Sequence, residues 1–386
     1  MDHGAGMPID SRVFEAMRPY FFENYGNPSS SHSFGNSTKE ALAASREKVA
    51  QLVAAEKPQE IIFTSGGTES NNLAIKGVAF RNREKGNHII TTAIEHMSVM
   101  NICKYLQKQG FEVTYVPVDK QGVVDLEKLK DAINDKTILI SVMYANGEIG
   151  TIQPIREIGK VARENNVIFH VDAVAAAGKV PLNVAEENID LLSLSSNDMY
   201  GPKGVGALYI KRGIKIQPII QGGGQERGLR SGTENIPGIV GMGKAAEIAK
   251  MEMESESKRL TRLRDKLIKG VLDKIEYSFL NGHPVERLPD NANLRFSYIE
   301  GESLILGLDM LGIQVSSGSA CTSKTLEASH VLLAIGLAHE EAHGSLVFTM
   351  GRQNSEEDVD YVLEVLPDVV KRLRILSPLT PKEILR

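Results

Sequence analysis

Cysteine, basic charge and long apolar runs are all scarce in this sequence, and each scarcity excludes a class of protein. Two cysteines in 386 residues cannot form a disulfide framework, so we expect free thiols in a reducing compartment. A net charge of −5 argues against nucleic acid as the main partner. No apolar run reaches membrane-spanning length, and the first residues lack the segments of a signal peptide. We therefore expect a cytoplasmic protein with no membrane partner.

The rest of the composition is that of a globular protein that is too long for one compact core. Strand patterns alternate with helical patterns, which predicts an α/β fold with a mostly parallel sheet covered by helices. Ser37 and Glu40 form a capping-box pattern that predicts the start of an early helix. The strands are expected at residues 60–64, 88–94, 111–118, 137–145, 167–174, 190–196 and 205–211, and helices between them at 97–109, 125–133 and 155–164.

A second, smaller domain is expected at the C-terminal end. A long helical pattern over residues 236–275 changes composition near residues 253–257, and we place the boundary there. Residues 13–250 would then form the large domain. Residues 1–12 and 251–386 would form a small α+β domain, with a strand near 292–299 and helices near 303–311 and 355–373.

A glycine-rich turn follows the first predicted strand. The segment SGGT at residues 65–68 leads into a helical pattern that continues to about residue 83. A strand, a glycine turn and a helix start together direct free backbone N–H groups and the positive end of the helix dipole at one point, which suits a phosphate. Many such turns are merely tight, so the turn alone leaves both interpretations open.

Polar residues stand at the carboxyl ends of several predicted strands, where ligands collect in parallel sheets. Asp172 ends the apolar strand IFHVD, and a buried carboxylate there needs a partner. It could cap a neighbouring helix, or it could be the counter-charge of a protonated ring nitrogen such as that of pyridoxal phosphate. The other strand-end residues are Thr68, His96, Asn146 and residues 195–198.

The run SSGSACTS at residues 316–323 places one of the two thiols, Cys321, among small polar residues. Serines in such a run bond to local backbone, which predicts a loop. The thiol could be an ordinary loop side chain, a nucleophile or a metal ligand. The second thiol, Cys103, falls within an apolar helical pattern and is expected to be inert.

A polar, glycine-rich loop is expected at residues 221–233, and it carries Arg227 and Arg230. A long segment without secondary structure is usually functional. The loop could be solvated, or it could make a contact across a dimer interface.

With these features in place, the sequence resembles a cysteine desulfurase of the IscS/NifS type, in the fold-type I group of pyridoxal-phosphate enzymes. The resemblance runs nearly from end to end. Its strongest motifs are FTSGGTESNNLAIKG at residues 63–77, YGPKG at 200–204, RSGT at 230–233 and SSGSAC at 316–321.

The resemblance implies a role for each matching position. Pyridoxal 5′-phosphate would be the cofactor, and Cys321 would take sulfur from L-cysteine as a persulfide, leaving L-alanine. The homodimer implied by the family would place Thr233 in the partner's phosphate site. An iron–sulfur scaffold protein of the IscU type would accept the sulfur, and Cys321 could also ligate iron in a [2Fe-2S] cluster shared with it. The remaining implied cofactor contacts are Gly67, Thr68 and Ser195 for the phosphate, His96 stacked on the ring, Asp172 on the ring nitrogen and Asn146 near the other ring substituents.

This chain departs from the family pattern at residues that carry chemistry. The family has a histidine and the Schiff-base lysine where this chain has Asn197 and Asp198. A glutamine that faces the cofactor is replaced by Ala175, and the arginine that anchors the substrate carboxylate is replaced by Val347. Lys203 matches a second lysine of the family, so we do not expect it to replace the missing one. The cofactor is therefore expected to bind without a covalent link.

Three functions follow from this pattern. The first is a cysteine desulfurase, a sulfurtransferase of iron–sulfur cluster assembly, with lowered activity because a positioned proton-transfer group typically contributes ~10²–10⁴ in rate. The second is a non-catalytic homologue that relays sulfur or docks on a cluster scaffold. A different pyridoxal-phosphate reaction is the third, and the cysteine loop argues against it.

Overall fold

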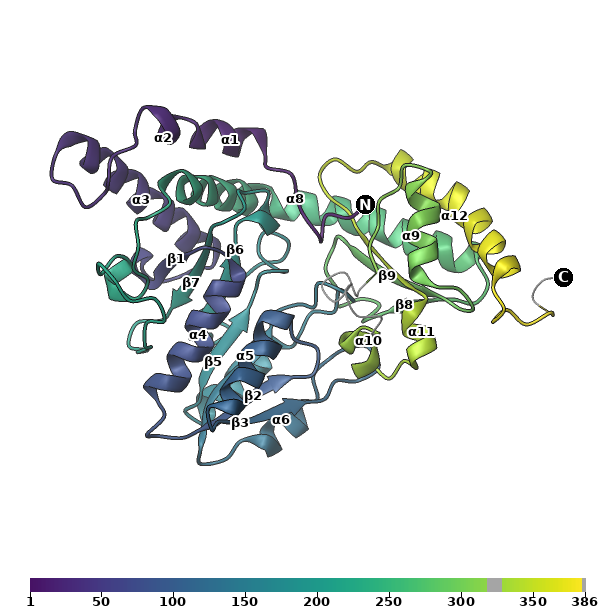
Figure 1. The fold of residues 1–386 in the computed structure, drawn as a ribbon, viewed down its shortest axis with the longest axis horizontal. Helices are drawn as coiled ribbons and strands as arrows, with labels where there is room; N and C mark the ends of the chain where they lie inside the picture. Colours follow the sequence, from purple (N-terminus) through teal and green to yellow (C-terminus); the bar gives the residue numbers. More distant parts are fainter. Residues whose placement is uncertain (318–327, 384–386) are drawn as a thin grey trace.

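The computed structural model describes residues 1–317 and 328–383 of the chain. Its centre is a seven-stranded sheet with the strand order β1-β7-β6-β5-β4-β2-β3, flanked by helices on both faces (Figure 1). All neighbouring strands are parallel except β7, which runs antiparallel to β1 and to β6. The α/β fold with a mostly parallel sheet is confirmed. The strands are β1 (Ile61–Thr64), β2 (His88–Thr92), β3 (Glu112–Val116), β4 (Thr137–Met143), β5 (Ile168–Asp172), β6 (Leu191–Ser195) and β7 (Gly206–Ile210).

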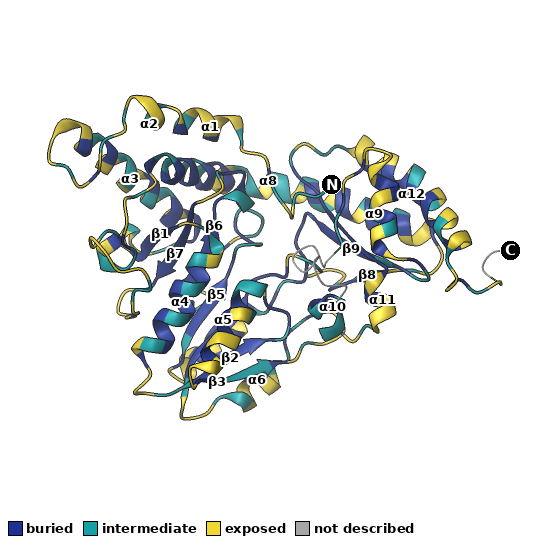
Figure 2. Cartoon of the chain, in the orientation of Figure 1, coloured by how far each residue is buried: buried dark blue, intermediate teal, exposed yellow. Residues whose placement is uncertain are grey.

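Apart from the edge strand β3, the strands of this sheet are buried on both faces, which is why their sequences read as apolar runs (Figure 2). Alternate residues enter different apolar clusters: Ile61 and Phe63 join one, and Ile62 joins the other. The first cluster includes helices α1 (Ser11–Met17), α3 (Ser33–Leu52), α7 (Ile155–Glu164) and the first part of α8 (Ile236–Lys274). The second includes α4 (Gly67–Arg81) and α5 (Met97–Lys108). Two helical layers therefore hold the carboxyl ends of the strands in place.

A smaller, antiparallel sheet has the order β10-β9-β8 and forms a separate apolar cluster with helices. Its strands are β8 (Ser278–Asn281), β9 (Asn291–Phe296) and β10 (Ser345–Thr349), and its helices are α9 (Gly301–Asp309), α12 (Glu356–Leu376) and the second part of α8. The first cluster ends along α8 at Ala249, and this cluster begins at Leu260. The domain boundary itself remains a prediction. The long helical pattern is confirmed, because α8 is one continuous helix through residues 253–257.

The start of α3 differs from the prediction. The predicted capping box at Ser37 and Glu40 was wrong, because α3 begins four residues before Ser37, at Ser33, with His32 as its N-cap. Among the described residues, no helix is long and apolar enough to cross a membrane.

Short elements connect the layers. They are α2 (Pro19–Phe22), η1 (Pro58–Glu60), α6 (Leu126–Ala132), η2 (Asn197–Met199), η3 (Glu226–Gly228), α10 (His330–Ala334) and α11 (His339–His343).

Candidate functional site

The turn between β1 and α4 leaves the start of a 15-residue helix open. Gly66 is the N-cap, and it makes no side-chain capping bond. Its φ of 152° lies in a region that side-chain-bearing residues rarely adopt, so the turn requires glycine there. The first N–H groups of α4 therefore point to the strand ends, with the positive end of the helix dipole behind them. This geometry can hold a phosphate.

Gly67 is required because a side chain at this position would collide with its neighbours. A Cβ atom at this position would lie 2.6 Å from Cγ2 of Val174 and 3.7 Å from Cβ of Ser195. The turn thus packs directly against the residues that follow β5 and end β6. Thr68, the next residue, is exposed at the start of the helix. The structure brings together the three residues that the sequence placed at the phosphate: Gly67, Thr68 and Ser195.

Asp172 ends β5 and is buried, with 6% of its surface exposed. Its Oδ2 accepts a hydrogen bond of 2.7 Å from Asn71 Nδ2, and its Oδ1 accepts one of 3.1 Å from the Val174 N–H. Burial raises the pKa of Asp172, and the hydrogen bonds act in the opposite direction. Within the described ranges, this carboxylate forms no ion pair with a lysine or arginine. A protonated ring nitrogen would supply the missing positive partner.

A chain of hydrogen bonds joins Asp172 to His96. Asn71 Nδ2 also donates to Ser98 Oγ at 2.9 Å, and Ser98 Oγ lies 2.8 Å from Nδ1 of His96. His96 is the N-cap of α5, and its Nδ1 accepts the Ser98 N–H at 3.1 Å. These bonds fix the exposed imidazole of His96 beside the strand ends. In the described part of the chain, Oδ1 of Asn71 is buried and has no hydrogen-bond partner. The ring and the orphan amide oxygen both suit a flat polar cofactor.

Asn146 also lies at the strand ends, but both ends of its side-chain amide are already hydrogen-bonded, to its own turn and to Ile94. Its Oδ1 accepts the N–H groups of Glu148 and Ile149 at 2.9 Å each, and its Nδ2 donates to the Ile94 carbonyl. We therefore assign it first to shaping this turn. Ala175 lies across from the turn, where a Cβ on Gly147 would stand 3.6 Å from its own Cβ. Its methyl group offers no polar contact at this place.

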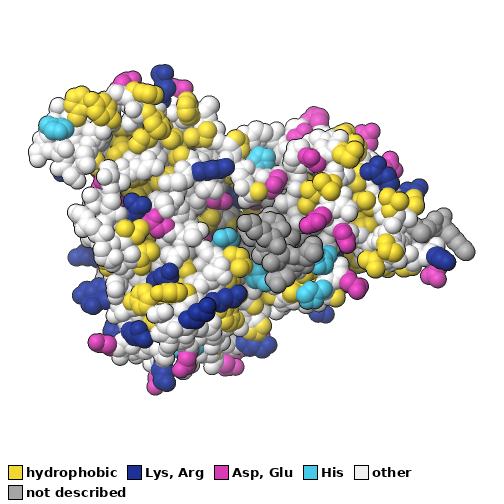
Figure 3. All heavy atoms as spheres, in the orientation of Figure 1, with side chains coloured by type: hydrophobic (Ala, Val, Ile, Leu, Met, Phe, Trp, Pro, Cys, Tyr) yellow, Lys and Arg dark blue, Asp and Glu magenta, His cyan; other side chains and the backbone are white. Residues whose placement is uncertain are grey.

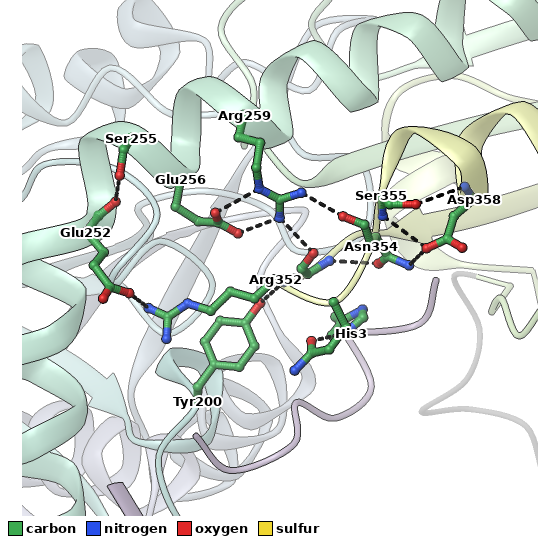
Figure 4. Close-up of polar contacts among 12 residues, drawn as sticks. His3, Tyr200, Glu252, Ser255, Glu256, Arg259, Arg352, Asn354, Ser355 and Asp358 are labelled. Atoms are coloured by element: carbon green, nitrogen blue, oxygen red, sulfur yellow. Dashed lines mark hydrogen bonds and ion pairs between the residues drawn. The ribbon is translucent and has the colours of Figure 1, made fainter. Parts of the chain in front are cut away.

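The segment after β6 carries the residues that replace the expected histidine and lysine. Ser195 Oγ donates to Asn197 Oδ1 at 2.7 Å, and Asn197 Nδ2 donates to Asp198 Oδ2 at 2.8 Å. Tyr200 follows in the left-handed region with φ of 60°. Figure 4 shows its hydroxyl beside Arg352, three residues beyond the end of β10, where it accepts the Arg352 N–H at 2.8 Å. The backbone around Asp198 is thus fixed between the two sheets.

Asp198 shares its surroundings with two residues that the sequence interpretation missed. Lys179 Nζ lies 2.8 Å from Oδ2 of Asp290, and both side chains are nearly buried. Burial acts against the charge of Lys179, but Asp290 outweighs it and raises the Lys179 pKa. Burial raises the pKa of Asp198 to about 6, and Lys179 acts against this rise. Lys179 and Asp290 lie so far apart in the sequence that no local pattern indicates their contact.

The small-domain side of the site is apolar where the family pattern has a cation. Val347 is buried in β10, and its N–H donates to the Ser316 carbonyl at 2.7 Å. Cys321 itself lies outside the described residues, although Ser316 ties the preceding chain to β10. The other thiol, Cys103, is fully buried, and burial raises its pKa to about 12.

The loop of residues 221–233 is anchored to its own subunit. Glu226 accepts bonds of 2.7 and 2.6 Å from Arg46 and a 2.9 Å bond from the Phe63 N–H. Arg230 pairs with Glu69 on the first turn of α4 at 2.9 Å. Thr233 lies beyond these anchors and is exposed.

Together, these residues fit pyridoxal phosphate at its ring nitrogen and its phosphate. They do not fit a covalent lysine link at position 198, where the chain presents a carboxylate. In the described part of the chain, no three histidine, cysteine, aspartate or glutamate side chains come together as a metal site.

Comparison with known proteins agrees with this geometry. The family model "Aminotransferase class-V" matches residues 1–362. "Cysteine desulfurase IscS 1" of Archaeoglobus fulgidus is 58% identical over 378 residues, which cover 98% of each chain. Among solved structures, a "NifS-like protein" superposes with a TM-score of 0.90 at 40% identity, covering 96% of this chain and 99% of its own. Another, "SspA in complex with cysteine", gives a TM-score of 0.80 at 37% identity, covering 90% and 97%.

Proposed function

The chain belongs to the class V aminotransferase family, and we propose that it acts there as a cysteine desulfurase, a sulfurtransferase that takes sulfur from L-cysteine and leaves L-alanine. The observation that carries the proposal is the 58% identity to the Archaeoglobus relative along 98% of both chains. The site adds support, because the turn at Gly67 and the buried Asp172 suit the two ends of pyridoxal phosphate.

Pyridoxal phosphate, when bound, supplies an electron sink for the negative charge that forms on the substrate's α-carbon. The open start of α4 and Ser195 would hold its phosphate. Asp172 would balance the charge of its ring nitrogen, and His96 would cover its ring. The described residues thus bind and orient the cofactor through strand ends fixed by two layers of helices. Because Asp198 stands at the lysine position, this binding is non-covalent.

Cys321 is the sulfur acceptor in this proposal. Its Sγ bonds to the substrate's sulfur as the substrate's C–S bond breaks, and the substrate carbon takes up a proton to give alanine. Only the thiolate is a good nucleophile, and a cysteine among small polar residues can ionise and reach substrate. Cys103, with its buried thiol and raised pKa, is unsuited to this role. A cytoplasmic location belongs to the same proposal, since a reducing compartment keeps the thiol free.

The protein works as a homodimer in this proposal. Thr233 is exposed in its own subunit and would complete the partner's phosphate site. Aromatic side chains are also exposed near the N-terminus, with Phe22 at 78% and Tyr25 at 70%. Figure 3 shows hydrophobic side chains gathered over α1 to α3. A patch of this kind is typical of a protein interface.

A scaffold protein for iron–sulfur assembly is the proposed recipient of the sulfur. The small domain offers exposed apolar side chains for it: Leu306 on α9, Met310 at the C-cap of α9 and Leu376 at the end of α12. A [2Fe-2S] cluster shared through Cys321 remains a prediction from the family resemblance.

The proposed function is tested by incubating the dimer with pyridoxal phosphate and L-cysteine, and by measuring alanine and protein-bound persulfide. We expect both products from the wild type and neither from Cys321→Ala. Cys103→Ala is the matched control and should behave as the wild type. Alanine release from Cys321→Ala at the wild-type rate would contradict the role of Cys321. Absence of both products from the wild type with saturating cofactor would contradict the function.

A further inference from the structure

The turn that follows β4 (residues 146–151, the β4 turn) contacts both segments that carry the proposed ring contacts. β4 lies between β5 and β2 in the sheet, so its carboxyl end lies between Asp172 and the segment that leads to His96. Nδ2 of Asn146 donates to the backbone carbonyl two residues before His96, at 2.9 Å. On the other side, a Cβ atom on Gly147 would stand 3.6 Å from the Cβ atom three residues after Asp172. The position of the β4 turn therefore affects the spacing between the two segments.

Side chains from β9 of the smaller sheet hold the β4 turn by its backbone carbonyls. Nδ2 of Asn291 donates to the carbonyls of Gly147 and Glu148, at 2.9 and 3.1 Å. Nδ2 of Asn293 donates to the second of these carbonyls at 3.1 Å. Both asparagines are fully buried, so water cannot replace these hydrogen bonds without opening the contact. The smaller sheet thus fixes a turn that lies at the strand ends of the larger one.

Arg287 lies at the centre of this contact. It is 3% exposed, and an arginine is rarely so buried without an acidic partner. Nη2 donates to the carbonyl of Ile149 in the β4 turn at 3.2 Å and to Oδ1 of Asn291 at 3.2 Å. In the described part of the chain, its hydrogen bonds all go to uncharged oxygens: Oδ1 of Asn291 and the carbonyls of Ile149, Asn281, His283 and Asn291. One guanidinium group therefore joins the β4 turn to the chain around β9.

The shape of the guanidinium group explains why an arginine is used. A buried charge is costly unless its donors are satisfied, and the planar fork of arginine presents five N–H donors in fixed directions. Lysine presents its donors from a single nitrogen, so it cannot reach carbonyls on both sides of the contact. Because Oδ1 of Asn291 accepts from Arg287, the Nδ2 atom of the same amide is directed to the β4 turn. Arg287 therefore acts on the turn directly and through Asn291.

We propose that Arg287 is a positioning residue for the cofactor site. Together with Asn291 it fixes the β4 turn, and the turn sets the spacing between the segments of Asp172 and His96. The inference rests on the proposed function and deepens it, because it gives the smaller sheet a part in binding the cofactor. A ring that contacts Asp172 at its nitrogen and His96 at its face needs both side chains at fixed positions. A shift of the turn would therefore weaken binding and change how the ring is held.

The first test compares Arg287→Lys with a matched arginine. Arg374 is also buried and donates to two backbone carbonyls, those of Tyr277 and Ser297, at 3.2 Å each. Neither carbonyl belongs to the β4 turn, so Arg374→Lys controls for a general loss of stability, which thermal unfolding measures in both variants. We expect the Kd of pyridoxal phosphate, from fluorescence titration, to rise about 10-fold in Arg287→Lys, the size of effect that a lost hydrogen bond can have. Arg374→Lys should keep the wild-type Kd.

The bound cofactor also reports the shape of its site. Pyridoxal phosphate is achiral, so its circular dichroism arises only where the protein holds the ring in one orientation. We expect this band to change in Arg287→Lys and to stay unchanged in Arg374→Lys. A wild-type Kd and band in Arg287→Lys would overturn the proposal, as would equal changes in both variants. The titration needs no cysteine, so a wild type that binds the cofactor and releases no alanine would contradict the proposed function alone.

A second variant tests the same contact even if Arg287→Lys does not fold. Asn291→Asp keeps an oxygen for Arg287 and removes the Nδ2 donor to the carbonyls of the β4 turn. We expect it to fold, with a weaker Kd for pyridoxal phosphate and a changed band. Cofactor binding by Asn291→Asp that matches the wild type in both respects would overturn the proposal.

A double-mutant cycle tests the route from Arg287 through the turn. Asn146→Ala removes the bond between the β4 turn and the segment before His96. If the turn carries the effect, Arg287→Lys should raise the Kd of pyridoxal phosphate less in the Asn146→Ala background than in the wild type, because coupled residues are not additive. Equal effects of Arg287→Lys in the two backgrounds would overturn this route.

Discussion

The two halves of the cofactor site differ in what holds them in place. The first half, at Gly67 and Asp172, is made of a backbone turn and a strand-end carboxylate, and it keeps every feature that a bound phosphate and ring nitrogen require. The second half, at Asp198 and Val347, lies on a well-fixed backbone but carries side chains that differ from those of the family pattern. Binding depends on backbone N–H groups and packing, whereas covalent chemistry depends on single side chains. The side chains of the second half can therefore change the covalent chemistry of the site while the first half still binds the cofactor.

The largest expected effect comes from making the second half match the family. Asp198→Lys should form a covalent link to pyridoxal phosphate, because Tyr200 and its bond to Arg352 keep the backbone in place. The variant should retain cofactor through gel filtration, whereas the wild type should lose it. Absorbance before and after borohydride, compared with Asp198→Asn, reports the link. If the lysine variant gives no new band, the two halves do not face the same cofactor.

Breaking the first half should have the next largest effect. Asp172→Asn removes the counter-charge of the ring nitrogen, and a hydrogen bond to a charged group contributes about 1.5–3 kcal/mol. We expect the cofactor's Kd to rise about 10- to 100-fold, measured by fluorescence titration. Asp190→Asn changes a carboxylate that pairs with Lys211 away from the site and is the matched control. An unchanged Kd in Asp172→Asn would refute the assigned role.

A smaller effect is expected from crowding the phosphate turn. Gly67→Ala would place its Cβ 2.6 Å from Val174, so one of the two must move. Such a shift costs about 1–3 kcal/mol and should weaken cofactor binding by about tenfold. Val174→Ala in the same chain should restore much of the affinity. If the single and double variants bind equally well, the turn is not limited by this contact.

The smallest expected effect concerns the sheet that both halves share. His170 in β5 is buried between the hydroxyl groups of Ser141 and Ser193, and burial lowers its pKa to about 3. The unfolded chain therefore binds the proton first, so stability falls as the pH drops below about 6.5. We expect a loss of roughly 1 kcal/mol between pH 7 and pH 5.5 relative to His170→Gln, measured by urea unfolding. Equal pH profiles of the two proteins would contradict this, because they would show that the pKa of His170 is the same in the folded and unfolded chain.

The first half of this site could be predicted from sequence because each of its residues lies in a short continuous segment with a recognisable pattern. The turn at Gly67 and the acid at Asp172 each follow an apolar strand, and the periodicity of the chain places strand ends at one edge. The contact of Lys179 with Asp290 depends on how the small sheet packs against the large one, and no local pattern encodes it. The length of α8 could be predicted from its helical pattern, and the change of composition near residues 253–257 marks a change of packing partner and does not end the helix.

The most direct test of the central claim is to measure the cofactor's mode of attachment. The wild-type protein is saturated with pyridoxal phosphate, treated with borohydride and examined by mass spectrometry under native and denaturing conditions. The account predicts one cofactor for each chain under native conditions and the unmodified chain mass after denaturation. A reduced adduct on Lys179 or Lys203 would contradict it, because it would show that another lysine provides the covalent link.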